Sequence, residues 1–148
     1  MERCAEAWGE HAYDAVRAAG YKAGGGRHAV IELLARQECC LTAQEIFDRL
    51  RAGGRRVGIA TVYRVLELLA ELRLVQRVDL GDGIARFEPL LPDGEHHHHL
   101  VCDGCGKVEV FADDRLESAL EHAAATAGYS VAAHEVVLRG ACADCRPA

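Results

Sequence analysis

The residues with the clearest potential for chemistry are two pairs of cysteines near the end of the chain. Cys102 and Cys105 are separated by two residues, and so are Cys142 and Cys145. A two-residue gap in a tight turn directs both thiolates to one point, and two such turns complete a tetrahedral site for a structural Zn²⁺ ion. We favour this interpretation over a pair of disulfides or an iron–sulfur cluster.

Four consecutive histidines, residues 96–99, precede the first cysteine pair. Side chains alternate between the two faces of a β-strand. A strand here would direct His96 and His98 to one side and His97 and His99 to the other. Two metal sites back to back are therefore predicted, each needing further ligands, for which the candidates are Glu117 and His134. A solvated polar loop is the alternative.

The composition predicts that the chain folds into an ordered protein. The chain has 148 residues, of which 50% are hydrophobic and 27% charged, which disfavours disorder. No apolar run approaches the roughly 18 residues that a membrane span needs. The first residues are charged and lack the apolar centre of a secretory leader. We therefore expect a cytoplasmic protein with reduced thiols, in which paired cysteines bind metal.

The net charge of −6 is unevenly distributed. Residues 22–86 contain 11 Lys and Arg against 8 Asp and Glu, whereas residues 91–148 contain 4 against 10. All the candidate ligands named above lie in the acidic part. Pro and Gly interrupt the pattern at residues 90–94, so two domains are predicted, at residues 1–90 and 91–148.

The first domain reads as helices followed by a hairpin. Apolar spacing and stop signals predict helices at about 5–19, 27–36 and 59–72, and another that begins at the Thr42–Glu45 capping box and ends at Gly53. Strands at 74–78 and 84–88 flank the turn 81–83. Helices followed by a hairpin form a winged helix-turn-helix.

In such folds the last helix enters the major groove of DNA. The start of helix 59–72 carries three side chains off its apolar face, Thr61, Tyr63 and Arg64, which suit contacts with base edges and phosphates. Attraction to the DNA backbone would come from further cations: Lys22, Arg27, Arg55 and Arg56. The alternative is that these are ordinary solvated charges.

The second domain reads as strand, turn, strand, helix, strand. The predicted strands are residues 97–101, 107–111 and 130–139, and the predicted helix is residues 113–126, closed by Gly128. The whole chain is therefore assigned to the α+β class. The second domain is small enough to need a metal or a partner subunit for stability.

Four segments together resemble the ferric uptake regulator family: residues 58–66 (GIATVYRVL), 86–89 (RFEP), 96–108 (HHHHLVCDGCGKV) and 140–145 (GACADC). The family consists of bacterial homodimeric metal-sensing repressors with an N-terminal winged helix and a C-terminal α/β dimerisation domain. The resemblance implies a repressor that binds operator double-stranded DNA as a metal-loaded homodimer, and not an enzyme.

The resemblance also implies three metal sites. The two cysteine pairs match the structural zinc site. A site within the dimerisation domain is matched by His96, His98, Glu117 and His134. The sensing site at the hinge is matched by Cys40, Glu88, His97 and His99. Strand alternation divides the histidines in the same way, whereas Cys40 and Glu88 come from the resemblance alone.

The sensed metal is a finer question. The zinc uptake regulators that this chain resembles use Cys in their hinge site. Iron sensors of the family usually carry Asp where this chain has His98 and His where it has Cys40. A thiolate with imidazoles favours Zn²⁺ over Fe²⁺, so we predict zinc sensing, with an iron-responsive regulator as the alternative. One departure is Val110, where the family often has an acidic residue, while Glu109 is displaced to the opposite face.

Two other classes of function remain open from the residues alone. A zinc hydrolase would use His96, His98 and His134 around a bound water, but the chain has no HExxH motif to supply a general base. A metal-buffering protein would bind the same ions without contacting DNA.

Overall fold

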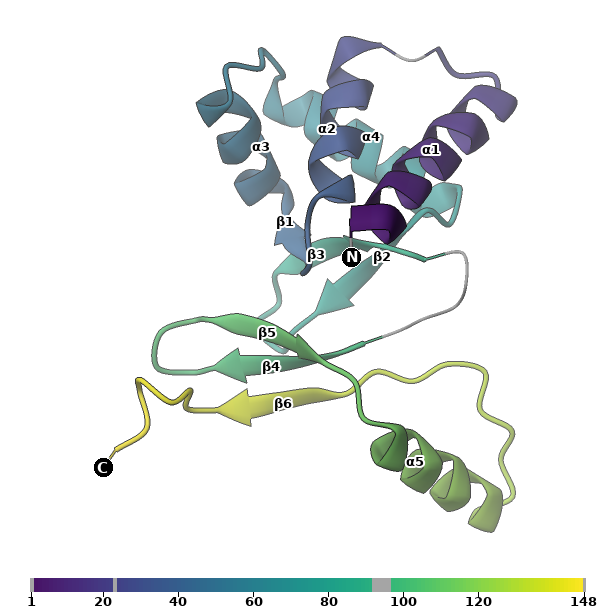
Figure 1. The fold of residues 1–148 in the computed structure, drawn as a ribbon, viewed down its shortest axis with the longest axis vertical. Helices are drawn as coiled ribbons and strands as arrows, with labels where there is room; N and C mark the ends of the chain where they lie inside the picture. Colours follow the sequence, from purple (N-terminus) through teal and green to yellow (C-terminus); the bar gives the residue numbers. More distant parts are fainter. Residues whose placement is uncertain (1, 23, 92–96, 148) are drawn as a thin grey trace. The chain divides into compact units, whose positions relative to one another are not determined.

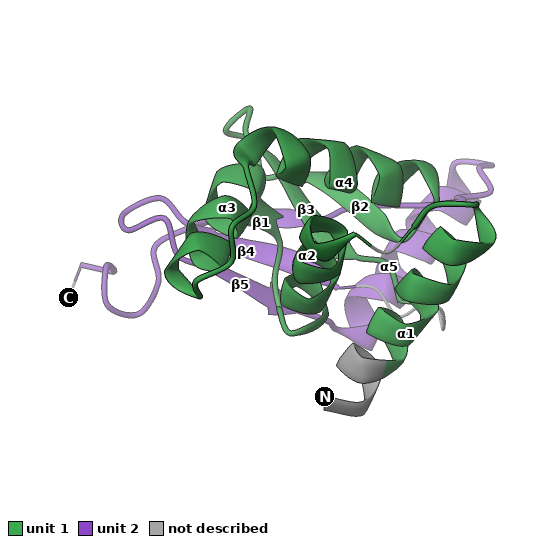
Figure 2. Ribbon diagram, turned by 90° about the horizontal axis from the view of Figure 1, so that it is seen from above, with its two compact units in different colours: residues 1–95 green, residues 96–148 purple. Residues whose placement is uncertain are grey.

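The computed structural model describes residues 2–22, 24–91 and 97–147, with side chains from residue 7 onward. The chain divides into two compact units, residues 1–95 and 96–148 (Figure 2). Each unit pairs a three-stranded sheet with helical structure, four helices in the described part of the first unit and one in that of the second (Figure 1), which confirms the predicted α+β class. No helix in the described part of the chain is long and apolar enough to cross a membrane.

The described residues of the first unit form four helices and a small antiparallel sheet. In chain order its elements are α1 (Glu2–Ala18), α2 (Gly25–Ala35), β1 (Leu41–Thr42), α3 (Ala43–Ala52), α4 (Ile59–Glu71), β2 (Val75–Asp79) and β3 (Ala85–Pro89). The strand order is β1-β3-β2. The predicted helices and hairpin are all present, with ends that differ by a few residues. The two-residue strand β1 was not predicted, because so short a strand has no periodicity to detect.

The helices pack around one apolar core. Its fully buried side chains come from every helix of the unit and from the chain that follows α4. Trp8 of α1 is 1% exposed, and its Nε1 donates a hydrogen bond to the carbonyl oxygen of Leu74, 3.0 Å away. The buried indole therefore satisfies its polar group while it joins α1 to the start of the hairpin.

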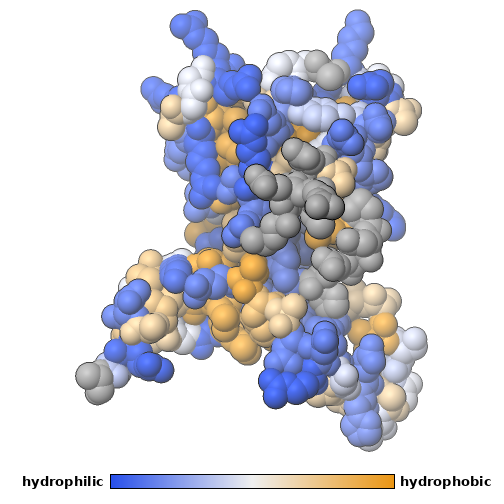
Figure 3. Space-filling view, viewed as in Figure 1, coloured by the Kyte–Doolittle hydropathy of each residue, from blue (hydrophilic) through white to orange (hydrophobic). Residues whose placement is uncertain are grey.

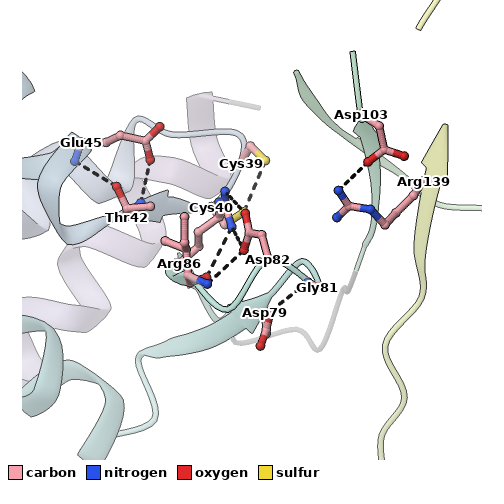
Figure 4. Close-up of polar contacts among 11 residues, drawn as sticks. Cys39, Cys40, Thr42, Glu45, Asp79, Gly81, Asp82, Arg86, Asp103 and Arg139 are labelled. Atoms are coloured by element: carbon pink, nitrogen blue, oxygen red, sulfur yellow. Dashed lines mark hydrogen bonds and ion pairs between the residues drawn. The ribbon is translucent and has the colours of Figure 1, made fainter. Parts of the chain in front are cut away.

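The hairpin between β2 and β3 turns through two glycines with left-handed backbone. Gly81 and Gly83 have φ of 86° and 74°, values that other residues adopt only at a cost. Asp82 accepts a hydrogen bond from the backbone N–H of Ile84 and forms an ion pair of 2.8 Å with Arg86 (Figure 4). The turn is thus tied to the adjacent end of β3.

The second unit is built on a central strand with one neighbour on each side. Its elements are β4 (His98–Cys102), β5 (Val108–Phe111), α5 (Asp114–Thr126) and β6 (Val137–Gly140). β4 pairs antiparallel with β5 and parallel with β6. Asp113 caps α5, because its carboxylate accepts hydrogen bonds from two backbone amides of the first turn.

The closing strand is shorter than predicted. Residues 130–139 were expected to be a strand, but only Val137–Gly140 form β6. The register pairs Val137 with His99, near the beginning of β4. One further hydrogen bond runs from the backbone N–H of His99 to the carbonyl oxygen of Val136, but the strand itself begins at Val137, so His134 lies in an irregular segment.

The capping box of α3 gives a test of the first unit. The Thr42 hydroxyl accepts a hydrogen bond from the backbone N–H of Glu45 at 3.1 Å, and the Glu45 carboxylate accepts one from the backbone N–H of Thr42 at 2.8 Å (Figure 4). Thr42→Ala should lower the free energy of unfolding of this unit by about 1 kcal/mol, measured by urea denaturation. Thr42→Ser keeps the hydroxyl and should cost much less; equal losses would show that the cap is not the cause.

Candidate metal centres and DNA-binding helix

The four cysteines of the two pairs come together in the second unit. Cys102 ends β4, Cys105 follows in the turn before β5, and Cys142 and Cys145 follow β6. Their sulfur atoms all lie within 4.8 Å of one another, and the Sγ atoms of Cys105 and Cys142 are 3.8 Å apart. A disulfide bond would need about 2.05 Å. No disulfide bond joins any of the described cysteines, so the structure contradicts the disulfide alternative.

Backbone amides of this cluster stabilise a negatively charged sulfur, which is the form that binds a metal cation. The backbone N–H of Cys142 donates to the Sγ of Cys102 at 3.3 Å. This bond, followed by those from Cys105 and Gly104, lowers the pKa of the Cys102 thiol to about 6. The pKa of Cys145 is raised to about 12, first by its hydrogen bond with Cys105. One sulfur is therefore charged at neutral pH while another keeps its proton, which a metal ion would displace.

A second cluster joins β4, α5 and the segment before β6. The two oxygens of the Glu117 carboxylate face different imidazoles: Oε1 is 2.6 Å from Nε2 of His98, and Oε2 is 2.9 Å from Nε2 of His134. His98 is 1% exposed, and the three side chains offer ligand atoms within 4.8 Å of one another. The structure therefore brings together three of the four residues predicted for this site. His96 lies outside the described residues.

His99 occupies the opposite face of β4. It is buried, and its ring lies 5.2 Å from that of His97, centroid to centroid. This agrees with the predicted alternation, because His98 turns toward Glu117 instead.

The register of β4 with β5 places Val110 beside His99 and Glu109 beside Leu100. Glu109 thus lies on the other face and pairs with Lys107 at 2.9 Å, so it does not replace the acidic residue missing at Val110.

Cys40 and Glu88 lie in the first unit, and both are buried. Cys40 immediately precedes β1, and Glu88 lies on β3, the strand that β1 pairs with. The pKa of the Cys40 thiol is raised, first by its hydrogen bond with Cys39, then by burial and by the negative charge of Glu88. Cys40 and Glu88 belong to one unit and His97 and His99 to the other. A site shared by all four residues therefore stays a prediction.

Sequence reasoning missed two residues next to these candidates. Gln76 faces Glu88 across the β2–β3 ladder, and its amide donates a hydrogen bond to the Glu88 carboxylate. The Sγ of Cys39 is 3.8 Å from that of Cys40. The adjacent Cys39-Cys40 pair is visible in the sequence, whereas the Gln76 contact depends on strand register, which a single sequence determines poorly.

Helix α4 presents a polar face away from the core. Val62, Val65 and Leu66 are buried, whereas Tyr63 and Arg64 are exposed and Thr61 is half-buried. The Arg64 guanidinium donates to the Thr61 hydroxyl at 3.4 Å.

Two of the other predicted DNA-binding residues lie at the start of α2. Lys22 is exposed, while Arg27 is half-buried and donates to the carbonyl oxygen of Lys22. Arg27 therefore fixes the lead-in to α2 as well as adding positive charge.

A hollow of about 560 Å³ lies where α3 ends and α4 begins. Three arginines of the first unit contribute to its lining: Arg51, Arg55 and Arg56. Arg55 forms an ion pair of 3.0 Å with Glu32. Two of the four cations predicted to attract the DNA backbone, Arg55 and Arg56, thus lie at the turn that leads into α4.

Comparison with known proteins identifies the family. A family model described as "Ferric uptake regulator family" matches residues 18–139. The chain belongs to the ferric uptake regulator family. The ferric uptake regulation protein of Bacillus subtilis is 33% identical over 132 residues, which cover 88% of this chain and 89% of that protein. Members of the family are DNA-binding, metal-responsive transcription regulators, not enzymes.

Two solved structures of regulators are also similar to this chain. The Vibrio cholerae ferric uptake regulator superposes with a TM-score of 0.76 at 35% identity, covering 87% of this chain and 98% of that one. A zinc-bound manganese uptake regulator superposes with a TM-score of 0.73 at 25% identity, covering 88% and 97%. The match spans both units, so the arrangement of a DNA-binding domain followed by a dimerisation domain is confirmed.

The cysteine cluster yields a test with a matched control. A Cβ atom at Gly104 would lie 3.0 Å from the Cβ and 3.2 Å from the Sγ of Cys145, whereas one at Gly140 would meet nothing within 4 Å. Gly104→Ala should therefore displace Cys145, reduce bound metal and lower the melting temperature, measured by elemental analysis and calorimetry. Gly140→Ala should leave both unchanged. Full metal content in Gly104→Ala would contradict the close packing of this turn.

Proposed function

We propose that this protein is a cytoplasmic, zinc-responsive transcriptional repressor that binds operator DNA as a metal-loaded homodimer. The observation that carries the proposal is the pairing of a thiol with a carboxylate in the DNA-binding unit. Cys40 and Glu88 are buried on neighbouring segments of one sheet, and the charge of Glu88 acts on Cys40. Buried ionisable groups of this kind are characteristic of ligands and functional sites.

The four-cysteine cluster is proposed to hold a structural zinc ion. Zinc–sulfur bonds of about 2.3 Å in a tetrahedron place the sulfurs roughly 3.8 Å apart. The separation of 3.8 Å between the sulfurs of Cys105 and Cys142 fits this geometry. Four thiolates leave no open position for a substrate, so the ion would stabilise the end of β4 and the chain after β6.

The regulatory ion is proposed to bind Cys40, Glu88, His97 and His99. Its ligands come from both units, so binding would restrict their relative motion. One thiolate, one carboxylate and two imidazoles suit Zn²⁺. The relatives do not decide the metal: one is named for ferric uptake, and another is a manganese uptake regulator with zinc bound. An iron-responsive regulator is the alternative, and Cys40 is the feature that disfavours it.

A third ion is proposed for the cluster on the other face of β4. His98 and His134 flank Glu117, whose carboxylate oxygens lie 2.6 and 2.9 Å from their Nε2 atoms, so the three ligands converge on a place that a cation could occupy. His96 is proposed as the fourth ligand. This site lies wholly within the dimerisation unit, so its effect on DNA would act through the stability of that unit.

The homodimer is proposed to form through the second unit. Leu100 and Leu138 lie side by side in the β4–β6 register and are 38% and 49% exposed. Figure 3 shows hydrophobic surface gathered over this sheet. A dimer would present two α4 helices to successive half-sites of the operator. Metal binding would order the two DNA-binding units before they contact DNA, so less free energy of DNA binding would be lost in ordering them and the apparent affinity for DNA would rise.

The proposed metal response can be tested by DNA retardation at buffered concentrations of free Zn²⁺ and Fe²⁺. We expect retardation of a palindromic promoter fragment to appear as free zinc rises, because zinc fixes the DNA-binding units. Equal retardation with and without zinc would refute zinc sensing. A response to Fe²⁺ alone would support the iron-responsive alternative.

Two cysteine variants separate the regulatory site from the structural one. Cys40→Ser should stay folded and lose the zinc response, because it removes only the regulatory thiolate. Cys105→Ser should lose the structural ion and unfold the second unit. Circular dichroism and zinc content distinguish the two outcomes. Unfolding of Cys40→Ser would assign Cys40 a structural role instead.

The proposed contact between α4 and DNA predicts a selective loss of affinity. Arg64→Ala should weaken operator binding by roughly ten- to a hundred-fold, as expected for an arginine that contacts a base edge. Arg115 is an exposed arginine of the second unit, paired with Asp113, and Arg115→Ala should leave affinity unchanged. Fluorescence anisotropy at fixed salt measures both. Equal affinities for the two variants would exclude Arg64 from the interface.

A further inference from the structure

The thiol of Cys39, next to the proposed ligand Cys40, is not used by the proposed function. The two sulfur atoms are 3.8 Å apart and share a hydrogen bond (Figure 4). Among the described cysteines these are the two that lie outside the four-cysteine cluster. The proposed structural zinc site therefore does not explain why these two thiols lie next to each other.

The backbone around this pair can accommodate a change of geometry. Residues 37–40 form a bend between α2 and β1 and belong to neither element. A disulfide between adjacent residues closes a small, strained ring, because disulfides normally join Cα atoms more than 4.4 Å apart. A bend can distort to close such a ring, and the strain makes the disulfide easy to reduce again.

The two thiols also differ in access. Cys39 is half-buried, whereas Cys40 is buried with 6% exposure. A small oxidant would therefore reach Cys39 first and leave Cys40 beside the oxidised sulfur. This order is the one that a reacting thiol and a resolving thiol require.

We propose that Cys39 and Cys40 form a reversible peroxide-sensitive pair that controls the regulatory metal site. The Cys39 sulfur attacks hydrogen peroxide, the O–O bond breaks, and sulfenic acid and water form. The Cys40 thiol then displaces water from the sulfenic acid as the S–S bond forms. In total, two thiols and one hydrogen peroxide give one disulfide and two waters. A dithiol reductant reverses the reaction by returning two electrons and two protons.

The consequence for regulation rests on the proposed function, in which Cys40 is a zinc ligand. A sulfur engaged in a disulfide is no longer a thiolate and cannot bind zinc as one. Oxidation would therefore prevent zinc-dependent DNA binding, and bound zinc would protect the pair. The protein would release its operator either when zinc is scarce or when peroxide rises.

The chain offers a direct assay of this pair. Trypsin cleaves after Arg36 and Arg49, and peptide 37–49 contains Cys39 and Cys40 and no other cysteine. The full-length protein is treated with hydrogen peroxide, alkylated with iodoacetamide and digested. We expect the peptide to be lighter by two hydrogen atoms and unalkylated, and to accept two alkyl groups after reduction with dithiothreitol. Two alkyl groups before reduction would overturn the proposal.

Cys39→Ser is the matched variant. It should keep zinc-dependent retardation of DNA and make that retardation resistant to peroxide, whereas the wild type falls to its zinc-free level. A loss of zinc affinity in Cys39→Ser would make Cys39 a ligand and overturn the proposal. Oxidation of the wild-type pair at equal rates with and without zinc would instead reject Cys40 as a zinc ligand, while the disulfide itself would stand confirmed.

Discussion

The alternation of side chains along β4 is the constraint on which the metal chemistry depends. This strand lies between β5 and β6 and is hydrogen-bonded on both edges, so its register is fixed from two sides. A side-chain period of two then separates His98, which turns to Glu117, from His99 on the opposite face. Cys102 ends the same strand within the cysteine cluster. A slip of one residue would exchange the two histidines and disrupt two candidate sites at once.

The first unit supports its candidate ligands with buried polar contacts. Glu88 is 1% exposed, and an unsatisfied buried carboxylate would be costly. The Gln76 amide reduces this cost because it donates a hydrogen bond directly across the ladder. The donor is neutral, so it orients the carboxylate without competing for its charge as an arginine would. Such supporting contacts are what allow a ligand to remain in place when the ion leaves.

Local patterns in the sequence predicted most of the fold and much of the candidate sites. The Thr42 capping box and the placement of His98 and His99 on opposite faces of β4 each depend on a few neighbouring residues, and each is present as predicted. The two cysteine pairs also come together as predicted, although they are distant in the sequence. The errors arose where pairing at a distance decides the outcome. His134 was placed in a strand that forms only from Val137 onward, where the ladder with β4 begins. Gln76 escaped notice for the same reason, since its role exists only in the register with Glu88.

The position of Cys40 connects the proposed regulatory ligand to the elements that are proposed to contact DNA. Cys40 immediately precedes β1, whose last residue, Thr42, caps α3 and pairs with Arg86 on β3. Arg86 in turn holds Asp82 in the turn of the wing (Figure 4). Residue 40 is therefore connected to α3 through the Thr42 cap, and to the turn of the wing through strands β1 and β3. If an ion holds Cys40 as proposed, these connections would carry the constraint to the proposed DNA-binding surface of the same unit without a separate pathway of contacts.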